Sequence, residues 1–259
     1  MEIKFICLNL WQGGNLFDAI LQFLEQEDAD IIALQEVYDS KDLTLADKYR
    51  SIEVIRQHLG SAYHFDFAPA FLDNRKEGKI VQGNAVFSKF PIKSSNVTFF
   101  NEPYREDYTE VPANFPSCPR NLEHVVLQAD ARDIHIFNLQ GVWDLDGDNY
   151  SERRQKMSEK IIDAVKGKTN VIFAGDTNSK PTNKAMRDIE QYLVSVFGDT
   201  LKSSFNMRRK TNPGYATAAV DLMYVSPDVQ VLSHECRDID ISDHLPLIAK
   251  LRFSKDDNN

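Results

Sequence analysis

The stretch Val171-Ile172-Phe173-Ala174-Gly175-Asp176-Thr177-Asn178 decides how the rest of this chain is interpreted. Four consecutive apolar residues predict a buried strand, and the polar residues begin where that strand leaves the core. Gly175 permits a sharp exit, and side chains two positions apart, such as Asp176 and Asn178, can face the same way. Strand ends commonly carry chemistry, so the stretch predicts a buried strand that leads into a candidate site.

Three other segments show a similar arrangement. Asn9 follows the apolar run 3–8, Gln35-Glu36 follows the run 31–34, and Ser242-Asp243-His244 stands in a short turn. Taken singly, each segment is explained as well by a turn or a surface pair. Their shared placement beside strands predicts one active site that is assembled from both halves of the chain.

The remaining periodicity predicts helices and strands in mixed order. We expect helices over 16–24, 52–59, 151–165 and 183–196, the first of them capped by Asn15. We expect further strands over 63–67, 84–87, 122–128, 134–139, 220–225, 229–232 and 245–253. The proline-rich stretch 101–119 is expected to be a long loop over one edge of the site. Mixed rather than alternating elements favour an α+β fold of two mixed β-sheets packed face to face, with helices outside.

Composition bounds the domain organisation and the partners. The chain has 259 residues and 42% hydrophobic content, and without a linker or a repeat we expect one domain over 1–255 and a disordered tail over 256–259. The net charge of −9 gives no general affinity for polyanions. An anionic substrate therefore needs local help, from a bound cation or from the basic segment Met207-Arg208-Arg209-Lys210, which is otherwise a solvated loop.

Cysteine usage and hydropathy bear on the compartment. Cys7, Cys118 and Cys236 are widely spaced and lack a C-x-x-C pattern, which argues against disulfides and zinc knuckles. We find no signal peptide, and no apolar run approaches the roughly 18 residues of a transmembrane segment. We therefore expect a cytoplasmic monomer.

The polar residues fit the requirements of phosphate ester hydrolysis, which needs a cation, a group that aligns water, and donors for developing charge. The carboxylate of Glu36 and the amide oxygen of Asn9 suit Mg²⁺ or Mn²⁺ better than zinc. His244 can serve as general acid, general base or phosphate donor, tuned by a carboxylate such as Asp221.

A second acidic pattern is weaker. Asp144, Asp146 and Asp148 alternate as at the start of an EF-hand loop, but Gln155 stands where that loop needs a glutamate. We do not expect calcium to bind there.

The polar segments and their flanking strands resemble those of the endonuclease/exonuclease/phosphatase superfamily, whose fold is the deoxyribonuclease I-like four-layered α/β/β/α sandwich. The resemblance spans nearly the whole chain and rests on six motifs in family order: Cys7-Leu8-Asn9-Leu10-Trp11, Ala33-Leu34-Gln35-Glu36-Val37, Gly83-Asn84-Ala85-Val86-Phe87-Ser88-Lys89-Phe90-Pro91-Ile92, Gly175-Asp176-Thr177-Asn178-Ser179-Lys180-Pro181, Asp221-Leu222-Met223-Tyr224-Val225-Ser226 and Ser242-Asp243-His244-Leu245-Pro246.

For the metal and the attacking water, the resemblance implies specific roles. Glu36 would be the principal metal ligand, helped by Asn9, and Asp243 would complete the metal shell. Asp176 would position or deprotonate the water, while Asn178 would hold the water or the phosphate.

For the phosphate, the resemblance implies that His244 stabilises the transition state and that Asp221 holds its imidazole in the right tautomer. The chain departs from the family at Asn138-Leu139-Gln140-Gly141, where many members carry a second histidine and some a tyrosine. Gln140 can donate a hydrogen bond to phosphate but cannot transfer a proton near neutral pH. Losing a general acid would cost roughly 10²-fold in rate.

The roles of three further residues each have two interpretations. Arg120 is a candidate phosphate contact or a structural arginine, and Asn84 is a site wall or a turn residue. Trp11 either lines the pocket or packs, and packing is the expectation.

We therefore expect a divalent-metal-dependent phosphoesterase that cleaves a phosphodiester in a nucleic acid, a lipid head group or a small molecule by in-line attack of water. The alternatives are a phosphomonoesterase of the same fold and a catalytically silent binding module, because of Gln140. Aromatic and apolar residues of the loop 101–119 could stack bases or receive a ring-bearing alcohol or a lipid. These residues are Tyr104, Tyr108, Val111 and Phe115.

Overall fold

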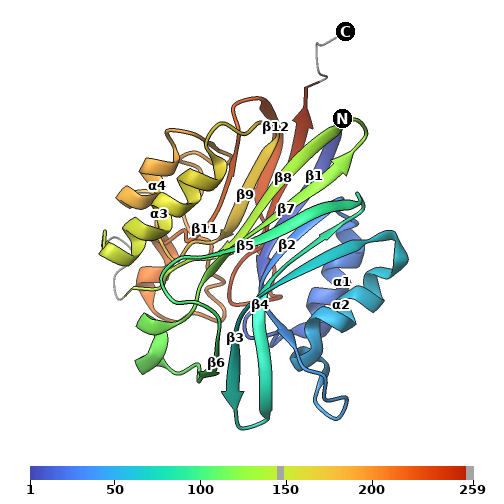
Figure 1. The fold of residues 1–259 in the computed structure, drawn as a ribbon, viewed down its shortest axis with the longest axis vertical. Coiled ribbons are helices and arrows are strands. Elements are labelled where there is room, and N and C mark those ends of the chain that lie inside the picture. Colours follow the sequence, from blue (N-terminus) through green and yellow to red (C-terminus); the bar gives the residue numbers. More distant parts are fainter. Residues whose placement is uncertain (145–148, 255–259) are drawn as a thin grey trace.

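The computed structural model describes residues 1–144 and 149–254. Within these residues the strands form two mixed sheets, one of seven strands and one of six, that lie between two groups of helices (Figure 1). The tail expected over 256–259 and the acidic residues Asp146 and Asp148 lie outside the described residues. None of the helices in the described part of the chain has the length and apolar character that crossing a bilayer requires.

The seven-stranded sheet contains the first and last strands of the chain. Its spatial order is β12 (Val229–Cys236), β13 (Leu247–Phe253), β1 (Glu2–Asn9), β2 (Ile31–Asp39), β4 (Gly78–Ser88), β3 (His64–Arg75) and β6 (Arg105–Tyr108). The pairs β1/β2 and β3/β6 are parallel and the others are antiparallel. Helices α1 (Phe17–Glu27) and α2 (Ser51–Leu59) cover its outer face (Figure 1).

The six-stranded sheet has the spatial order β10 (Val194–Ser195), β11 (Asp221–Val225), β9 (Val171–Asp176), β8 (Arg132–Gln140), β7 (Asn121–Ala129) and β5 (Ile92–Phe99). Only β8 and β9 are parallel neighbours among these described strands. Helices α3 (Glu152–Val165) and α4 (Lys184–Ile189) cover its outer face, opposite to α1 and α2 (Figure 1).

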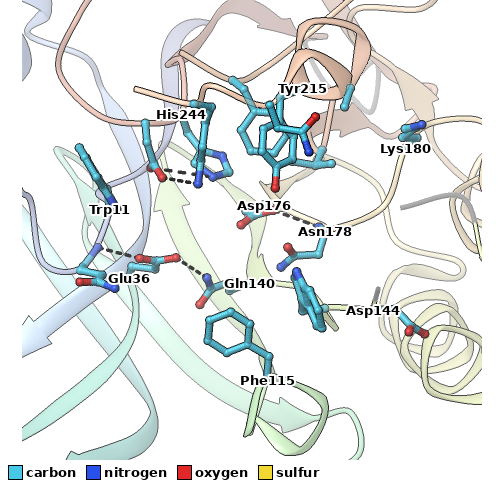
Figure 2. A pocket seen from close by; sticks show the side chains of 18 of the residues that line it. Trp11, Glu36, Phe115, Gln140, Asp144, Asp176, Asn178, Lys180, Tyr215 and His244 are labelled. Carbon is cyan, nitrogen blue, oxygen red and sulfur yellow. Dashed lines mark hydrogen bonds and ion pairs between the residues drawn. The ribbon is translucent and has the colours of Figure 1, made fainter. Parts of the chain in front are cut away.

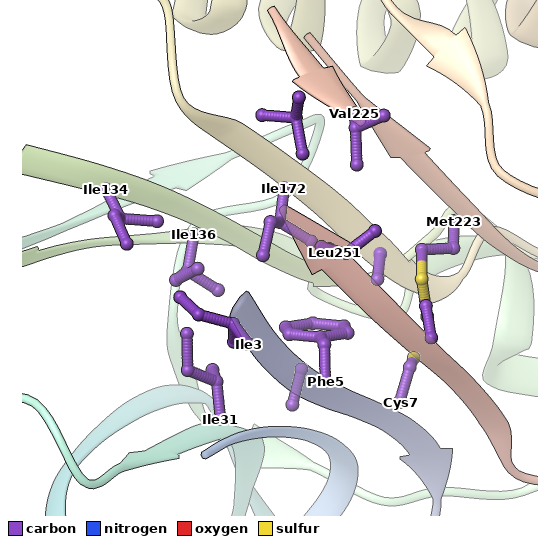
Figure 3. Close-up of a cluster of buried hydrophobic side chains, with 14 of the residues drawn as sticks. Ile3, Phe5, Cys7, Ile31, Ile134, Ile136, Ile172, Met223, Val225 and Leu251 are labelled. Carbon is purple, nitrogen blue, oxygen red and sulfur yellow. The ribbon is translucent and has the colours of Figure 1, made fainter. Parts of the chain in front are cut away.

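The alternation of side chains along each strand builds the layers. Ile3, Phe5 and Cys7 of β1 point toward the other sheet, where Ile136 and Ile172 belong to the same buried cluster (Figure 3). Ile6 and Leu8 of β1 belong to the cluster formed with α1 and α2. Because both faces of the strand are buried from Phe5 onward, residues 5–8 form a continuous apolar run. The result is the four-layered α/β/β/α sandwich, which confirms the predicted fold class.

Two details of the helix predictions are wrong. Helix α1 begins after Leu16, and Asn15 does not cap it, since the Asn15 side chain accepts a hydrogen bond from Lys48 instead. The helix expected over 183–196 ends at Ile189, and Val194 then pairs with Val225 of β11. Strand pairing at this sheet edge overrides the helical periodicity.

The proline-rich stretch 101–119 is more structured than a loop. It contains strand β6, which adds to β3 in parallel, and the 3₁₀ turn η3 (Pro112–Ser117). Tyr108 lies inside and packs edge-on against Phe71, with ring centroids 4.6 Å apart, so it belongs to the core. The other 3₁₀ turns are η1 (Asp47–Arg50), η2 (Gly60–Ala62) and η4 (Pro213–Thr217).

Candidate active site

The ends of strands from both sheets meet around one cavity of about 480 Å³. Within the six-stranded sheet, Asp176 pairs with Gln140 on one side and with Asp221 on the other, so three strand ends carry polar side chains to the same place. The seven-stranded sheet contributes Asn9 and Glu36 from β1 and β2. The predicted residues that line the cavity are Glu36, Arg120, Gln140, Asp176, Asn178, Asp243 and His244 (Figure 2).

A bulge in β2 directs Glu36 toward the cavity. The register of β2 against β4 shifts between Leu34 and Val37, and Glu36 has a φ of 55°. A non-glycine residue in this conformation stores roughly 1–3 kcal/mol of strain. Its carboxylate accepts hydrogen bonds at 2.7 Å from the backbone nitrogen of Gln12 and at 2.7 Å from Nε2 of Gln140. The bulge and these donors hold the carboxylate in one orientation.

Asn9 joins the carboxylates of the two sheets. Its Nδ2 lies 3.1 Å from Oε1 of Glu36 and 3.1 Å from Oδ2 of Asp176. Its Oδ1 accepts a hydrogen bond from the backbone nitrogen of Trp11 at 2.9 Å. In this structure Asn9 therefore donates to the two acids, and a rotation of its amide would be needed before its oxygen could bind a metal.

Asp176 and Asn178 form a tight turn after β9. Oδ1 of Asp176 accepts from the backbone nitrogen of Asn178 at 3.0 Å, and Nδ2 of Asn178 donates to the carbonyl of Gly141 at 3.1 Å. Gly175 has a φ of 153°, and a Cβ there would overlap the carbonyl oxygen of Leu139. Glycine is thus required for β9 to approach β8 this closely.

Burial raises the pKa of Asp176 to about 6, although the neighbouring His244 acts in the opposite direction. The negative charge of Asp221 adds to the increase. A carboxylate with such a pKa is ionised at neutral pH and is still basic enough to accept a proton from water.

His244 and Asp221 form a buried pair. Nδ1 of His244 lies 2.7 Å from Oδ2 of Asp221, and the two residues are only 6% and 2% exposed. Burial lowers the pKa of His244, but Asp221, together with Asp176 and Asp243, outweighs it and raises the pKa to about 10. The ring of Phe205 lies 4.8 Å from the imidazole centroid. The imidazole is therefore held as a cation whose Nδ1 donates to Asp221.

Asp243 pairs with a lysine that the motif analysis did not single out. Nζ of Lys210 lies 2.6 Å from Oδ2 of Asp243, and it also lies 5.7 Å and 5.8 Å from the ring centroids of Phe205 and Tyr215. Lys210 lines the cavity. The basic segment 207–210 was the only signal in the sequence for this residue.

The two arginines of the same segment are engaged elsewhere. Arg208 pairs with Asp238 and Arg209 pairs with Asp240, and neither arginine lines the cavity. Of the three basic residues in this segment, Lys210 is therefore the one that lies at the cavity.

Gln140 links Glu36 to a buried arginine. Its Nε2 donates to Glu36, and its Oε1 accepts from Arg120. Glu110, which the sequence did not indicate, also lines the cavity, and burial together with the charge of Glu36 raises its pKa to about 7. In this arrangement Gln140 orients Glu36.

Two other expectations have different outcomes. Asn84 does not line the cavity, because it is buried and donates to Oδ1 of Asn121 at 2.8 Å. Trp11, which we expected to pack, lines the cavity, as do Phe115 and Trp143. The sequence offered no signal for Trp143 beyond its aromatic character.

The side chains fit a divalent cation that prefers oxygen ligands. Glu36 and Asp243 offer carboxylate oxygens at the cavity. Ligand atoms of Asp176, Asp221 and His244 lie within 4.8 Å of one another, although one oxygen of Asp221 already holds His244. The other oxygen, Oδ1, is buried without a hydrogen-bond partner among the described residues. The donors are mainly carboxylates, which favours Mg²⁺ or Mn²⁺ over zinc.

Comparison with known proteins gives a consistent family assignment. A sequence model described as the endonuclease/exonuclease/phosphatase family matches residues 7–244. No curated protein sequence matches the chain. Among solved structures, an endonuclease/exonuclease/phosphatase from Beutenbergia cavernae superposes with a TM-score of 0.75 at 16% identity, covering 98% of this chain and 72% of that one.

Two further solved structures show the same fold. The mannosyl-6-phosphatase of Bacteroides thetaiotaomicron has a TM-score of 0.68 at 18% identity, covering 97% of this chain and 100% of that one. The catalytic domain of human nocturnin, with bound sulfate, has a TM-score of 0.70 at 16% identity, covering 98% of this chain and 94% of that one.

Proposed function

We propose that this chain, which belongs to the endonuclease/exonuclease/phosphatase family, hydrolyses a phosphate ester with the help of Mg²⁺ or Mn²⁺. Members of the family act on phosphate esters. The observation that carries the proposal is the meeting of a base, Asp176, a charged donor, His244, and an oriented carboxylate, Glu36, around one cavity. Perturbed titratable groups that meet in a cavity are more typical of a catalytic site than of a binding module.

Glu36 and Asp243 would hold the metal, with the oxygen of Asn9 after rotation of its amide. Lys210 would then leave Oδ2 of Asp243, because the ammonium and the metal compete for the same carboxylate. When bound, a divalent cation neutralises charge on the phosphoryl oxygens.

Asp176 would align the attacking water and accept its proton. The carboxylate is fixed by the backbone nitrogen of Asn178 on one oxygen and by Asn9 on the other. Such fixed geometry favours attack along one line. Asn178 lines the cavity and would contact the water or the phosphate.

His244 would donate a hydrogen bond from Nε2 to a phosphoryl oxygen, because Nδ1 is committed to Asp221. The pKa of about 10 keeps the imidazole protonated at neutral pH, so the donor carries a full charge. Removing one preorganised donor of this kind typically costs about 10²–10³ in kcat.

Protonation of the leaving alcohol sets a limit on the substrate. Gln140 cannot transfer a proton, and its amide is already bonded to Glu36 and Arg120. In our proposal the P–O bond to the alcohol breaks, the alkoxide takes its proton from solvent, and esters with acidic leaving groups react fastest.

We retain a phosphodiester as the expected substrate. A phosphomonoester is the second candidate, because Lys210 and His244 both lie beside Asp243 and Lys210 would supply a further positive charge for the dianion. Catalytic silence caused by Gln140 is the remaining alternative.

The test is release of product from bis(p-nitrophenyl) phosphate and p-nitrophenyl phosphate with Mg²⁺, using wild type, His244→Ala and the surface control His58→Ala. The side chain of His58 is partly exposed and lies 3.5 Å from Glu25. We expect metal-dependent cleavage that His244→Ala abolishes and His58→Ala leaves intact. Absence of cleavage of both esters would contradict the proposal and favour a silent module.

A further inference from the structure

Five phenylalanine, tyrosine or tryptophan side chains of the described residues line the cavity, and Phe205 also belongs to a buried cluster with Ala218 and Val220. The other four are Trp11, Phe115, Trp143 and Tyr215. Figure 2 shows Phe115 and Tyr215 on opposite sides of Asp176 and Asn178. None of the four rings belongs to a hydrophobic core cluster of the described residues. Core packing therefore does not account for their position.

The rings on both sides are held by other rings. Phe115 and Trp143 pack edge-on, with centroids 5.4 Å apart and an interplanar angle of 70°. Tyr215 is 36% exposed, and its ring centroid lies 4.5 Å from that of Phe205, whose ring in turn contacts His244. Ordered aromatic faces bind rings at a low entropy cost, because they lose little freedom on binding.

The charges of the cavity suit a single phosphate. Three arginine or lysine side chains in the described part of the chain line the cavity: Arg120, Lys180 and Lys210. Arg120 donates a hydrogen bond to Gln140, and Lys210 forms an ion pair with Asp243. The arginines at 208 and 209 pair with acids outside the cavity. The carboxylates that share the wall are Glu36, Glu110, Asp144, Asp176 and Asp243. Among the described residues, a wall with more carboxylates than lysines and arginines offers no continuous basic track along which further phosphates of a polynucleotide could lie.

We propose that the natural substrate is a small phosphate ester of a ring-bearing alcohol, a sugar or a nucleoside, with the ring held between Phe115–Trp143 and Tyr215. The inference rests on the proposed function. A cavity of about 480 Å³ has the size typical of small-ligand sites. The phosphate lies at Asp176 and His244, and the aromatic rings contact the alcohol.

The chain offers a direct binding signal for this proposal. It contains two tryptophans, Trp11 and Trp143, and both line the cavity. Intrinsic tryptophan fluorescence therefore reports on occupancy without any turnover. We expect adenosine 5′-monophosphate or glucose 6-phosphate to change the emission at concentrations at which glycerol 3-phosphate does not.

The kinetic test compares kcat/KM for these two ring-bearing esters with kcat/KM for acyclic glycerol 3-phosphate. Wild type should prefer at least one ring-bearing ester by about tenfold or more, and Trp143→Ala should reduce that ratio by about tenfold, the lower range for loss of one stacking contact. Tyr215→Ala is the second variant, because truncating an exposed side chain leaves the core intact. Phe65→Ala is the control, an exposed aromatic residue outside the cavity, and should leave the ratio unchanged.

The outcomes separate the two proposals. If wild type hydrolyses all three esters with equal kcat/KM, the ring proposal is overturned and the phosphoesterase proposal stands. The same conclusion follows if Trp143→Ala and Tyr215→Ala lower kcat/KM equally for ring-bearing and acyclic esters. Absence of hydrolysis of all three monoesters, together with absence of cleavage of bis(p-nitrophenyl) phosphate, would overturn the phosphoesterase proposal. In that case equal fluorescence responses to ring-bearing and acyclic esters would overturn the ring proposal as well.

Discussion

The substitution Asp221→Asn removes the charge that holds His244 protonated. Asp221 accepts from Nδ1 of His244 at 2.7 Å and is the main cause of the rise in its pKa from 6.5 to about 10. At pH 8 an imidazole with a pKa of about 10 is about 99% protonated, and one with a pKa of about 6.5 is about 3% protonated. The protonated fraction therefore falls about 30-fold; burial of the ring lowers it further, whereas the charges of Asp176 and Asp243 oppose that effect. We expect kcat at pH 8 to fall about 30-fold, with partial recovery below pH 6 limited by Asp176.

The assay combines kcat between pH 5 and 10 with an NMR titration of the His244 ring. Asp133→Asn is the matched control, because Asp133 forms an exposed ion pair with Lys93. The control should retain the wild-type profile. If Asp221→Asn keeps the wild-type kcat at pH 8, or if its His244 ring still titrates above pH 9, the charge coupling is not what activates the histidine.

Three other predictions follow from the same geometry. Catalysis requires ionised Asp176, whose pKa is about 6, so kcat/KM should fall about tenfold per pH unit below pH 6 and stay level up to the loss of the His244 proton near pH 10. A kcat/KM that does not fall below pH 6 would exclude Asp176 as the base. Gly175→Ala should lower the free energy of unfolding, measured in urea, by roughly 1–3 kcal/mol more than Gly167→Ala, because a Cβ at position 175 overlaps a backbone carbonyl while position 167 faces open space. Equal decreases in the free energy of unfolding would mean that β9 can shift to make room for the Cβ. Raising the salt from 50 to 200 mM should change kcat/KM for a small ester less than about twofold, since a polyanion held by 6–10 phosphate contacts would lose roughly 10³–10⁵ in affinity.

The strand ends of the site could be predicted because both faces of β1, β2 and β9 are buried. Continuous apolar runs then mark the strands, and the polar residue after each run marks the edge of the core. Asn9, Glu36 and Asp176 were found in this way. The pairing of Asp176 with Asp221 depends on the placement of β9 beside β11 in the sheet, which the apolar runs do not reveal.

Other parts of the site depend on tertiary contacts that leave no local pattern. Lys210 and Arg208 belong to the same basic segment, but Lys210 forms an ion pair with Asp243 at the cavity and Arg208 forms one with Asp238 outside it. Trp11 has a φ of 64° in the turn after β1, and that conformation directs it to the cavity although its sequence context suits packing.

The role of Gln140 shows the same limit. The sequence showed the absence of a second histidine but could not show that the amide links Arg120 to Glu36. Residues 84 and 121 likewise form a buried amide pair across the sheets, which a turn motif does not reveal.

The most direct test of the account is Mg²⁺ binding to wild type and Glu36→Gln by isothermal titration calorimetry, with product release measured on the same samples. Glu53→Gln is the control, because Glu53 forms an exposed pair with Arg56. Glu36→Gln should weaken Mg²⁺ binding at least about tenfold and abolish metal-dependent hydrolysis, since one of the charged oxygen ligands is lost. Unchanged Mg²⁺ affinity in Glu36→Gln, or hydrolysis that persists with excess chelator, would contradict this prediction.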